Sequence, residues 1–539
     1  MRKPKNKTLS TLLSLLNQEI IANGWCRHQP FIKSRRKFIS NAAKASVGAG
    51  IALSLPNLLT ACKNKSDENI LDVAILGGGM AGLNCANHLL PSNLSFQIFE
   101  ASKRLGGRIL THYNDSLGLG IFPEFGGDFI DSDHEDMLDL AKEFNLELID
   151  LVEEQEVNNY IKDIYYFDNR SISETEIIAE FKNIAPKLVA DIDALGENYD
   201  TEKAIALDNT PLSDYFKSLN CKQWLKDILD AAYIAEFGLD CSEQSTLNFL
   251  DMIDTNTNDG FKVFGASDER YRIKGGNSKV IEALVGKIGS NKIKTNHEVK
   301  AIKEQKDSTY LITFTDESTV VAKAIVCTIP FTILRKIKLD LKNISSEKRK
   351  CIDELGYGTN TKLVLGYKDR PWREQPNHAM GYLFHKDISN GWDGSYTKTE
   401  NNINNAYICF FGGKFSENLN AQSFKNKMAP PTHVWKTELP EQTVNKMVDD
   451  LNSVFPKSKE KFLDKHVFVN WIDYPFAKGS YSCYKVGQWS TIAGLEIEPI
   501  GNFLFAGEHC SELFQGFMNG AAATGKQVAT AILESIKVS

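Results

Sequence analysis

Apolar and polar positions alternate along most of the chain in blocks whose lengths predict a mixture of strands and helices. Residues 70–76 (ILDVAIL) form a nearly continuous apolar run of strand length, which is typical of a strand buried on both faces of a parallel sheet. A helix-length segment follows at 83–90, and a second short apolar run occupies 95–99. This order predicts a strand–helix–strand unit that begins at residue 70.

The same kinds of pattern continue towards the C-terminal end. Residues 135–147 and 212–235 have helical periodicity, whereas 361–367 alternates as a strand does. Two further apolar strands are predicted at 323–329 and 503–506, and a long helical segment follows the second. The chain has 539 residues, 42% of them hydrophobic, which is enough for two or three domain-sized units of mixed α/β class.

The first 61 residues differ in character from the rest. A twin arginine, Arg35–Arg36, precedes an uncharged stretch at 45–61 that is rich in Gly, Ala and Ser. This layout is typical of a twin-arginine export signal, and Cys62 lies where a bacterial lipoprotein is cleaved and acylated. We therefore predict an exported periplasmic or cell-envelope lipoprotein, held at the membrane only through Cys62, with a polar linker at 62–69. A membrane anchor with an incidental cysteine is the alternative.

The distribution of charge argues against a nucleic-acid partner. The net charge is −7, and the first 61 residues contribute +9 of it, so the remainder carries −16. Nucleic-acid binding requires a basic surface, and an acidic body attracts cations instead. The ten cysteines and ten histidines show no metal-ligand spacing, so no metal site is expected.

The turn after the first predicted strand carries the residues that a dinucleotide-binding unit requires. Gly77, Gly79 and Gly82 form a GxGxxG pattern between strand 70–76 and the following helix. The first glycine permits the tight turn, the second lets backbone N–H groups approach a pyrophosphate, and the third allows close packing of helix on strand. Glu100 ends the second strand, where it can bind the adenosine ribose. A glycine-rich turn in some other α/β fold is the alternative.

Two segments that follow resemble those of the flavin-containing amine oxidase family, which includes monoamine, polyamine and L-amino-acid oxidases and histone-lysine demethylases. They are residues 100–108 (EASKRLGGR) and 124–130 (EFGGDFI). The resemblance continues through most of the chain and implies FAD as the cofactor, a small-molecule amine as the substrate and dioxygen as the electron acceptor. The further stretches that match, in order, are 272–277 with 297–299, 323–330, 471–481, and 503–508 with 516–521.

The resemblance also implies which residues bind the cofactor. Arg104 and Arg108 would serve the adenine–pyrophosphate end, Val299 the adenine, and Glu508 the ribityl hydroxyls, while the helix beginning near Met518 would direct its positive end at the isoalloxazine. The complete set is Gly77, Gly79, Ala81, Gly82, Glu100, Arg104, Gly107, Arg108, Gly126, Gly127, Val299, Trp471, Ser480, Gly507, Glu508 and Met518.

Three residues are the candidates for catalytic roles. In the family, a lysine at the position of Lys362 holds a water near the reactive flavin nitrogen and assists reaction with dioxygen; a solvent-facing edge-strand lysine is the alternative. Tyr481 matches one of two tyrosines that flank the substrate nitrogen in monoamine oxidases, and Phe517 replaces the other. Ser480 stands where those enzymes carry the cysteine that attaches FAD covalently, so noncovalent FAD is expected.

The expected reaction is hydride transfer from an amine to the flavin, which gives an imine, then an aldehyde, and hydrogen peroxide. L-Amino-acid oxidases bind the substrate carboxylate with an arginine where this chain has Phe129, which favours amines, although Arg270 or Arg373 could replace it. An L-amino-acid oxidase therefore remains an alternative. A protoporphyrinogen oxidase or carotenoid desaturase type of dehydrogenase and a flavin-binding protein without turnover are the others. The sequence does not indicate an oligomeric state.

The order of the motifs predicts a discontinuous arrangement of two domains. A Rossmann-like FAD-binding domain would comprise 70–135, 265–335 and 463–535, and an inserted α+β substrate-binding domain would comprise 136–264 and 336–462. Binding pockets tend to form between such domains. The fold class is therefore α/β, with the site at the junction.

Overall fold

The computed structural model describes residues 70–113, 115, 117–399, 402–424 and 438–537. The predicted export signal at 1–61, the acylated Cys62 and the linker at 62–69 lie outside the described residues. Within the described part of the chain, no helix combines the length and the apolar character needed to cross a membrane.

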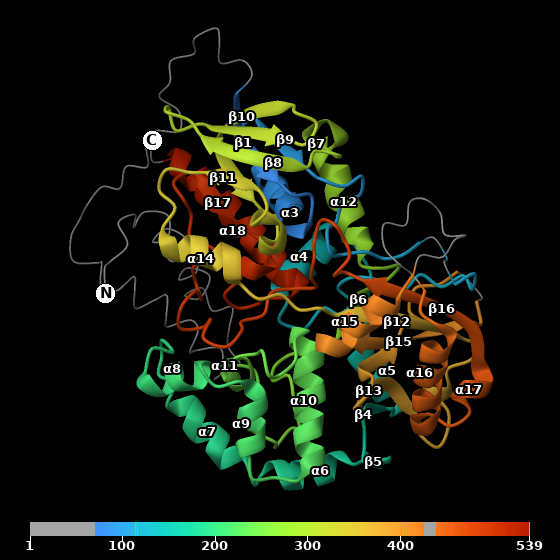
Figure 1. The fold of residues 1–539 in the computed structure, drawn as a ribbon. Coiled ribbons are helices and arrows are strands. Elements are labelled where there is room, and N and C mark those ends of the chain that lie inside the picture. Colours follow the sequence, from blue (N-terminus) through green and yellow to red (C-terminus); the bar gives the residue numbers. More distant parts are fainter. Residues whose placement is uncertain (1–69, 114, 116, 400–401, 425–437, 538–539) are drawn as a thin grey trace.

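One half of the molecule is built on an eight-stranded sheet (Figure 1). β1 lies in its interior, pairs in parallel with β10 and β2, and is buried over its second half, which explains its apolar sequence. β8, β9 and β10 form an antiparallel meander. The strands in order are β11 (Lys338–Asp340), β8 (Val299–Glu304), β9 (Tyr310–Phe314), β10 (Thr319–Cys327), β1 (Ile70–Leu76), β2 (Phe96–Phe99) and β7 (Ile293–Lys294), with β17 (Phe503–Phe505) also paired to β10.

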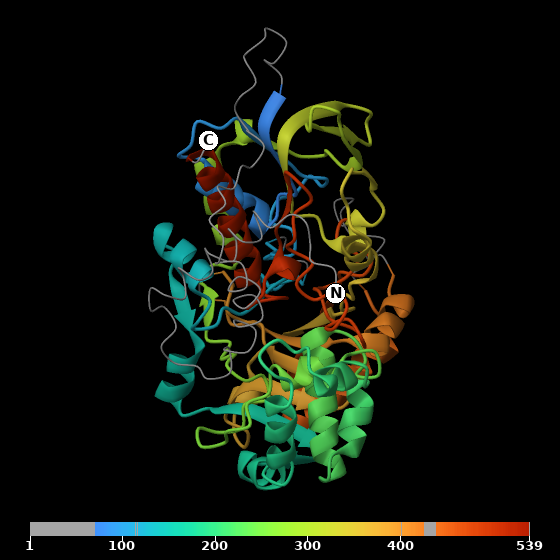
Figure 2. The ribbon, with the colours of Figure 1, turned by 90° about the vertical axis from the view of Figure 1, so that its left-hand side faces the viewer.

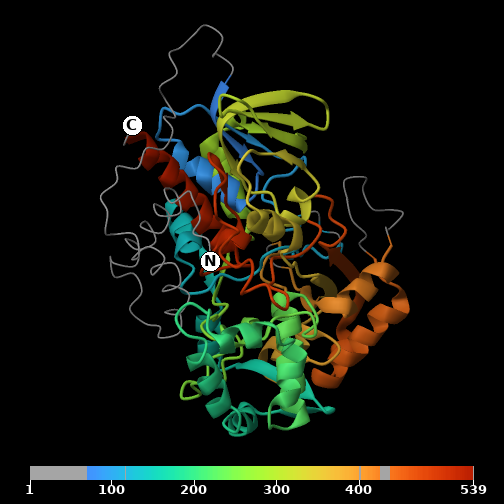
Figure 3. The same ribbon diagram turned by 60° about the vertical axis from the view of Figure 1, so that its left-hand side comes forward.

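Helices cover both faces of this sheet. α3 (Met80–Leu89), α12 (Ser278–Ile288) and α18 (Met518–Lys537) share one core with β1 and β2, and α18 lies directly beside α3 (Figures 1 and 3). α4 (Glu135–Glu143) packs at the end of this layer, and α13 (Phe331–Leu334) and α14 (Ser346–Glu354) pack on the opposite face. The arrangement is the predicted Rossmann-like one.

The other half contains a seven-stranded, largely antiparallel sheet in which only β13 and β4 pair in parallel. Its outer face is covered by α16 (Glu441–Val454), whose apolar side packs on β12 and β15. The strands in order are β16 (Phe462–Asn470), β12 (Thr361–Tyr367), β15 (Asn405–Phe411), β14 (Ser389–Asp393), β13 (Ala379–His385), β4 (Ile161–Phe167) and β5 (Arg170–Ile172). The short helices α15 (Gly413–Gln422), α17 (Ser458–Lys461) and η2 (Pro371–Arg373) complete this half.

A layer of helices with its own core lies beside the second sheet (Figure 2). It comprises α6 (Glu174–Phe181), α7 (Ala185–Asp193), α8 (Glu202–Asp208), α9 (Leu212–Ser218), α10 (Gln223–Phe237) and α11 (Thr246–Leu250). The remaining elements are β3 (Leu148–Asp150), which pairs with β6 (Tyr271–Ile273), and α5 (Leu151–Asn158), η1 (Ser290–Lys292) and η3 (Glu508–Cys510).

Several predicted boundaries differ from the structure. The helix predicted at 135–147 ends at Glu143, because Asn145 adopts a left-handed conformation with φ of 53°. The helix predicted at 212–235 is two helices, α9 and α10, and Leu219 and Lys222 between them have extended backbone.

The domain boundaries also move. β11 and α14 were predicted to belong to the substrate domain at 336–462. In the structure, β11 pairs with β8 of the first sheet, and α14 packs in the core of that sheet. Conversely, β16 lies almost wholly in the segment 463–535 that was predicted to be FAD-binding, yet it pairs with β12 of the second sheet. The predicted boundaries rested on the positions of the motifs along the chain. In the structure, the sheet to which a segment belongs depends instead on which distant strand it pairs with.

Replacing Gly82 with alanine is expected to destabilise the protein, because the new methyl group would lie 2.0 Å from the carbonyl oxygen of Gly77. Overpacking of this kind costs about 1–3 kcal/mol. Gly286 on α12 is the matched control, since a methyl group there meets nothing within 4 Å. Gly286→Ala should stabilise by about 0.5–1 kcal/mol. Thermal unfolding midpoints of the two variants should therefore move in opposite directions, and a Gly82→Ala midpoint at or above wild type would contradict the packing argument.

Candidate active site

A cavity runs between the two sheets and connects most of the predicted site residues. Its lining begins at the glycine turn after β1 and ends among aromatic and acidic side chains beneath α10. All of the predicted cofactor-binding residues line it except Gly82 and Arg104, and the three predicted catalytic residues line it as well. The junction of the two halves is therefore the candidate active site, as predicted.

The first end of the cavity has the shape and donors that a pyrophosphate needs. α3 begins directly after Gly79, so its N-terminus opens on the cavity. A Cβ atom at Gly79 would lie 3.8 Å from the Cα atom of Gly107, so the two glycine backbones approach each other closely here. Glu100 lines the same end, where its carboxylate accepts hydrogen bonds of 2.8 Å from the N–H groups of Gly78 and Ser102.

Arg104 and Gly82 support this end without lining it. The Arg104 guanidinium donates hydrogen bonds to the carbonyl oxygens of Gly107 at 2.6 Å and Leu105 at 3.1 Å, so it shapes the 104–109 loop. Gly82 lies against the Gly77 carbonyl, which agrees with its predicted packing role. Arg104 does not line the cavity, and its contact with the cofactor stays a prediction.

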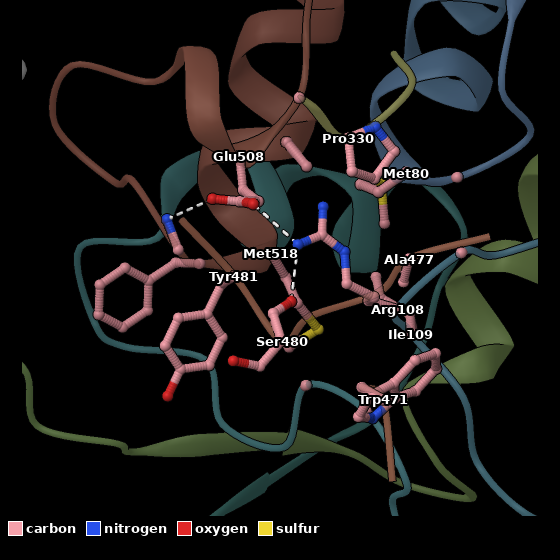
Figure 4. A pocket seen from close by; sticks show the side chains of 18 of the residues that line it. Met80, Arg108, Ile109, Pro330, Trp471, Ala477, Ser480, Tyr481, Glu508 and Met518 are labelled. Carbon is pink, nitrogen blue, oxygen red and sulfur yellow. Dashed lines mark hydrogen bonds and ion pairs between the residues drawn. The ribbon is translucent and has the colours of Figure 1, made fainter. Parts of the chain in front are cut away.

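An ion pair between Arg108 and Glu508 lines the cavity (Figure 4). Arg108 Nη1 donates to Glu508 Oε1 at 2.8 Å and to the Ser480 carbonyl at 2.7 Å. Glu508 also accepts hydrogen bonds from the Ser482 hydroxyl and from the Gly516 N–H. Burial opposes ionisation, but Arg108, His509 and the Ser482 hydroxyl hold the pKa of Glu508 below its usual value. The pair fixes the strand end at Gly507 against the start of α18.

Tyr481 and Phe517 lie at the start of α18. The Tyr481 hydroxyl donates to the Ala235 carbonyl at 3.0 Å, which ties it to the end of α10. Gly516 has φ of +91°, and a Cβ there would lie 3.7 Å from the Tyr481 ring, so the backbone before Phe517 runs beside that ring. Phe517 packs edge-on against His134, with ring centroids 5.2 Å apart.

Lys362 is buried, with 5% of its surface exposed. β12 lies between β15 and β16, so the alternative of a solvent-facing edge-strand lysine is wrong. Its Nζ donates to the Gly126 carbonyl at 2.8 Å and to Asp128 Oδ2 at 3.1 Å. Burial lowers the pKa of Lys362, and the negative charge of Asp128 acts against that shift.

Asp128 is a site residue that the sequence analysis missed. Besides Lys362, it binds Arg272 Nη1 at 3.0 Å and accepts a hydrogen bond of 2.9 Å from Trp392 Nε1. Arg272 lies between aromatic rings, with Phe129 at 4.5 Å from its guanidinium carbon. A buried lysine needs a counter-ion. The lysine in the apolar strand 361–367 therefore indicates that an acidic residue lies nearby, although it does not identify Asp128.

The two arginines considered as carboxylate clamps point elsewhere. Arg270 binds Asp150 at 2.6 Å, and Arg373 is paired with Asp393 and Glu154. Neither lines the cavity. The far end of the cavity carries acidic side chains instead, which the sequence analysis did not single out.

The residues present fit FAD. Two helix N-termini, those of α3 and α18, open on the cavity and can face the pyrophosphate and the reduced ring, both of which are negatively charged. Gly79 and Gly107 both line this end without a side chain, so backbone is exposed to the cavity where a pyrophosphate would lie. Glu100 and Val299 line the end expected for the adenosine.

Glu124 should make stability depend on pH. Burial, with the charge of Asp128, raises its pKa from 4.5 to about 7. Between these values the folded protein holds a proton that the unfolded chain releases, so the free energy of unfolding falls as pH rises. Glu124→Gln removes this titration and should gain about 3 kcal/mol relative to wild type from pH 4.5 to 7. Urea unfolding across this range, with exposed Glu460→Gln as control, tests it; a constant difference between variant and wild type would refute it.

Comparisons with known proteins agree with this geometry. The family model described as flavin-containing amine oxidoreductase matches residues 80–533. A pseudooxynicotine dehydrogenase from Pseudomonas sp is 22% identical over 524 residues, 94% of this chain and 96% of its own. Dog flavin-containing amine oxidase A is 21% identical over 88% of this chain and 87% of its own. The structure of cyclohexylamine oxidase from Brevibacterium oxydans IH-35A superposes with a TM-score of 0.71 at 20% identity, covering 87% of this chain and all of that one. The chain belongs to the flavin-containing amine oxidoreductase family, and FAD is its cofactor.

Proposed function

We propose that the protein oxidises an amine by hydride transfer from the α-carbon, giving an imine that hydrolyses to an aldehyde, with hydrogen peroxide as the second product. One observation carries this proposal: Tyr481 and Phe517 lie beside each other at the start of α18 and line the cavity. Arg108 and Lys362 are the lysine and arginine side chains that line the cavity in the described part of the chain, and each is already paired with a carboxylate. When bound, FAD supplies the hydride acceptor and the electrons that reduce dioxygen.

The aromatic pair accounts for orientation of the substrate. Aromatic faces attract an amine and can hold it with its nitrogen lone pair and α-hydrogen in a fixed direction. The hydrogen bond from Tyr481 to Ala235 fixes one ring, and the packing of Phe517 on His134 fixes the other. The reacting nitrogen must be neutral, because its lone pair takes the positive charge as the hydride leaves.

The charges around the cavity favour an amine over an amino acid. Arg108 is held by Glu508, and Lys362 is held by Asp128, so neither is free to bind a carboxylate. Phe129 offers no charge, and Arg270 and Arg373 lie outside the cavity lining. A substrate carboxylate would therefore be buried without a partner, which is costly.

Two features support acceptance and release of electrons. The N-terminus of α18 stabilises negative charge by about 0.3–1 kcal/mol, and more in a partly buried site. The Lys362 ammonium lies in the same lining and keeps its orientation through Gly126 and Asp128. We propose that Lys362 acts in the reaction with dioxygen.

Noncovalent attachment of FAD is part of the proposal. Within the described residues, no cysteine lines the cavity. Ser480 occupies the predicted attachment position and donates its hydroxyl hydrogen to Asn360 Oδ1 at 2.6 Å. A thioether bond to the flavin therefore has no sulfur to form from.

Export and lipid attachment also remain a proposal, supported by the twin arginine Arg35–Arg36 and by Cys62 after an apolar stretch. A twin-arginine pathway moves folded proteins, which suits a protein that binds FAD before it leaves the cytoplasm.

Primary amines should reduce the bound flavin faster than any L-amino acid does. The measurement is the rate of anaerobic flavin bleaching with a panel of monoamines, diamines and L-amino acids. The physical reason is the lack of a free cation for the carboxylate in the cavity lining. Faster bleaching by an L-amino acid than by every amine would refute the proposal, and no bleaching by any compound would support a binding protein without turnover.

Lys362→Met should slow reoxidation by dioxygen at least about tenfold, equivalent to about 1.4 kcal/mol of barrier, with a smaller effect on anaerobic reduction. The ammonium is lost at the cavity wall while the strand keeps an apolar side chain of similar length. Lys368→Met is the matched control, because Lys368 follows the same strand and is exposed. Stopped-flow traces of the two half-reactions separate the effects. Equal slowing of both would assign Lys362 a purely structural role, and normal reoxidation would contradict the proposed one.

A further inference from the structure

The far end of the cavity, beyond the aromatic pair, is acidic. Asp131, Glu236 and Glu269 line it and come from three separate segments: the turn before α4, the last turn of α10 and the loop before β6. The lysine and arginine side chains that line the cavity in the described chain are Lys362 and Arg108, and both are paired with other carboxylates. Asp131 lies 3.5 Å from His134 Nε2, but burial lowers the pKa of that imidazole to about 4, and no lysine or arginine of the cavity lining pairs with the three acids.

Glu236 is unpartnered. Its carboxylate makes no hydrogen bond or ion pair with any described residue, although it lines the cavity. It is also the penultimate residue of α10, where the negative end of the helix dipole disfavours a carboxylate. Burial and the charge of Asp131 raise its pKa to about 7. A cation at this point would relieve all of these costs.

Glu236 is close to the aromatic pair. The residue before it, Ala235, accepts the hydrogen bond from the Tyr481 hydroxyl. The negative charge of Glu236 also acts on the ionisation of Tyr481 and Tyr382. A substrate held by Tyr481 would therefore have its other end within reach of the acidic group.

Glu269 and Asp131 line the same acidic end and are held in place by hydrogen bonds. The Glu269 carboxylate accepts a hydrogen bond of 3.0 Å from the Tyr382 hydroxyl, and its N–H donates to Asp131 Oδ1 at 2.9 Å. Lys162 acts electrostatically on both acids, and Asp163 and Asp268 share its charge, but it does not line the cavity. The acids are therefore fixed in place without being neutralised by a cation in the cavity.

We propose that Glu236, supported by Glu269, binds a second, protonated nitrogen of the substrate, so that the preferred substrate is a diamine. This inference rests on the proposed function, because the other nitrogen must be the neutral one between Tyr481 and Phe517. The two ends of the cavity then make opposite demands. The aromatic end accepts an uncharged amine, and the acidic end accepts an ammonium. A monoamine would leave Glu236 unpaired, and sites that must pair a buried polar group discriminate strongly against ligands that lack the partner.

Binding to the reduced holoenzyme tests this without turnover, because dithionite-reduced FAD accepts no hydride. Isothermal titration calorimetry under anaerobic conditions would compare 1,4-diaminobutane with butylamine and 1,6-diaminohexane with hexylamine. At least one diamine should bind at least about tenfold more tightly than its matched monoamine, a difference of about 1.4 kcal/mol. If neither diamine exceeds its monoamine by threefold, the inference is wrong.

Two variants locate the effect. Glu236→Gln should weaken diamine binding about tenfold or more and monoamine binding by less than threefold, since it removes the charge and keeps the shape. Asp227→Asn on the same helix, which lies outside the cavity lining, should change neither. Equal weakening of both ligands by Glu236→Gln would place Glu236 at the reacting nitrogen and overturn the inference. Selective diamine binding without anaerobic bleaching by any amine would instead refute the proposed oxidation.

Discussion

The buried ion pair between Lys362 and Asp128 joins the two halves of the molecule. Lys362 belongs to an interior strand of the second sheet, whereas Asp128 follows the glycine turn that borders the cofactor end of the cavity. Arg272 and Trp392 complete the coordination of the same carboxylate. Loss of Asp128 would leave the charges of Lys362 and Arg272 without this partner, and breaking a buried ion pair in this way costs about 3–5 kcal/mol. The contact therefore ties β12 of the second sheet to the segment 126–128, which lines the cavity.

Local features of the fold could be predicted from the sequence because short segments determine them. β1 occupies the predicted residues and α18 begins at Met518, since apolar run length and glycine placement are local signals; the helix predicted at 83–90 is also present, but as α3 it begins earlier, at Met80. Lys362 could be recognised in the same way, because a lysine in an alternating apolar strand is conspicuous. Most predicted cofactor residues line the cavity for the same reason: they lie on glycine turns and strand ends.

Features that depend on distant segments could not be predicted. Nothing near β16 shows that it pairs with β12, about a hundred residues earlier in the chain. Asp128 becomes a counter-ion only because β12 crosses above it, and Arg104 binds loop carbonyls because that loop folds back on itself. The acids at the far end of the cavity come from three separate segments, so no single segment of the sequence indicates that they lie together.

The contact between α3 and α18 constrains when the protein can acquire its fold. Gly525 on α18 lies so close to Ala81 that a Cβ atom there would be 2.3 Å from its carbonyl oxygen, and β17 pairs with β10 in the interior of the first sheet. The βαβ unit of β1, α3 and β2 therefore completes its core only with β17 and α18, which come much later in the chain. The first half of the molecule is therefore closed by contacts between segments that lie far apart in the chain, and contacts of this kind slow folding because the intervening loop must be closed before they form.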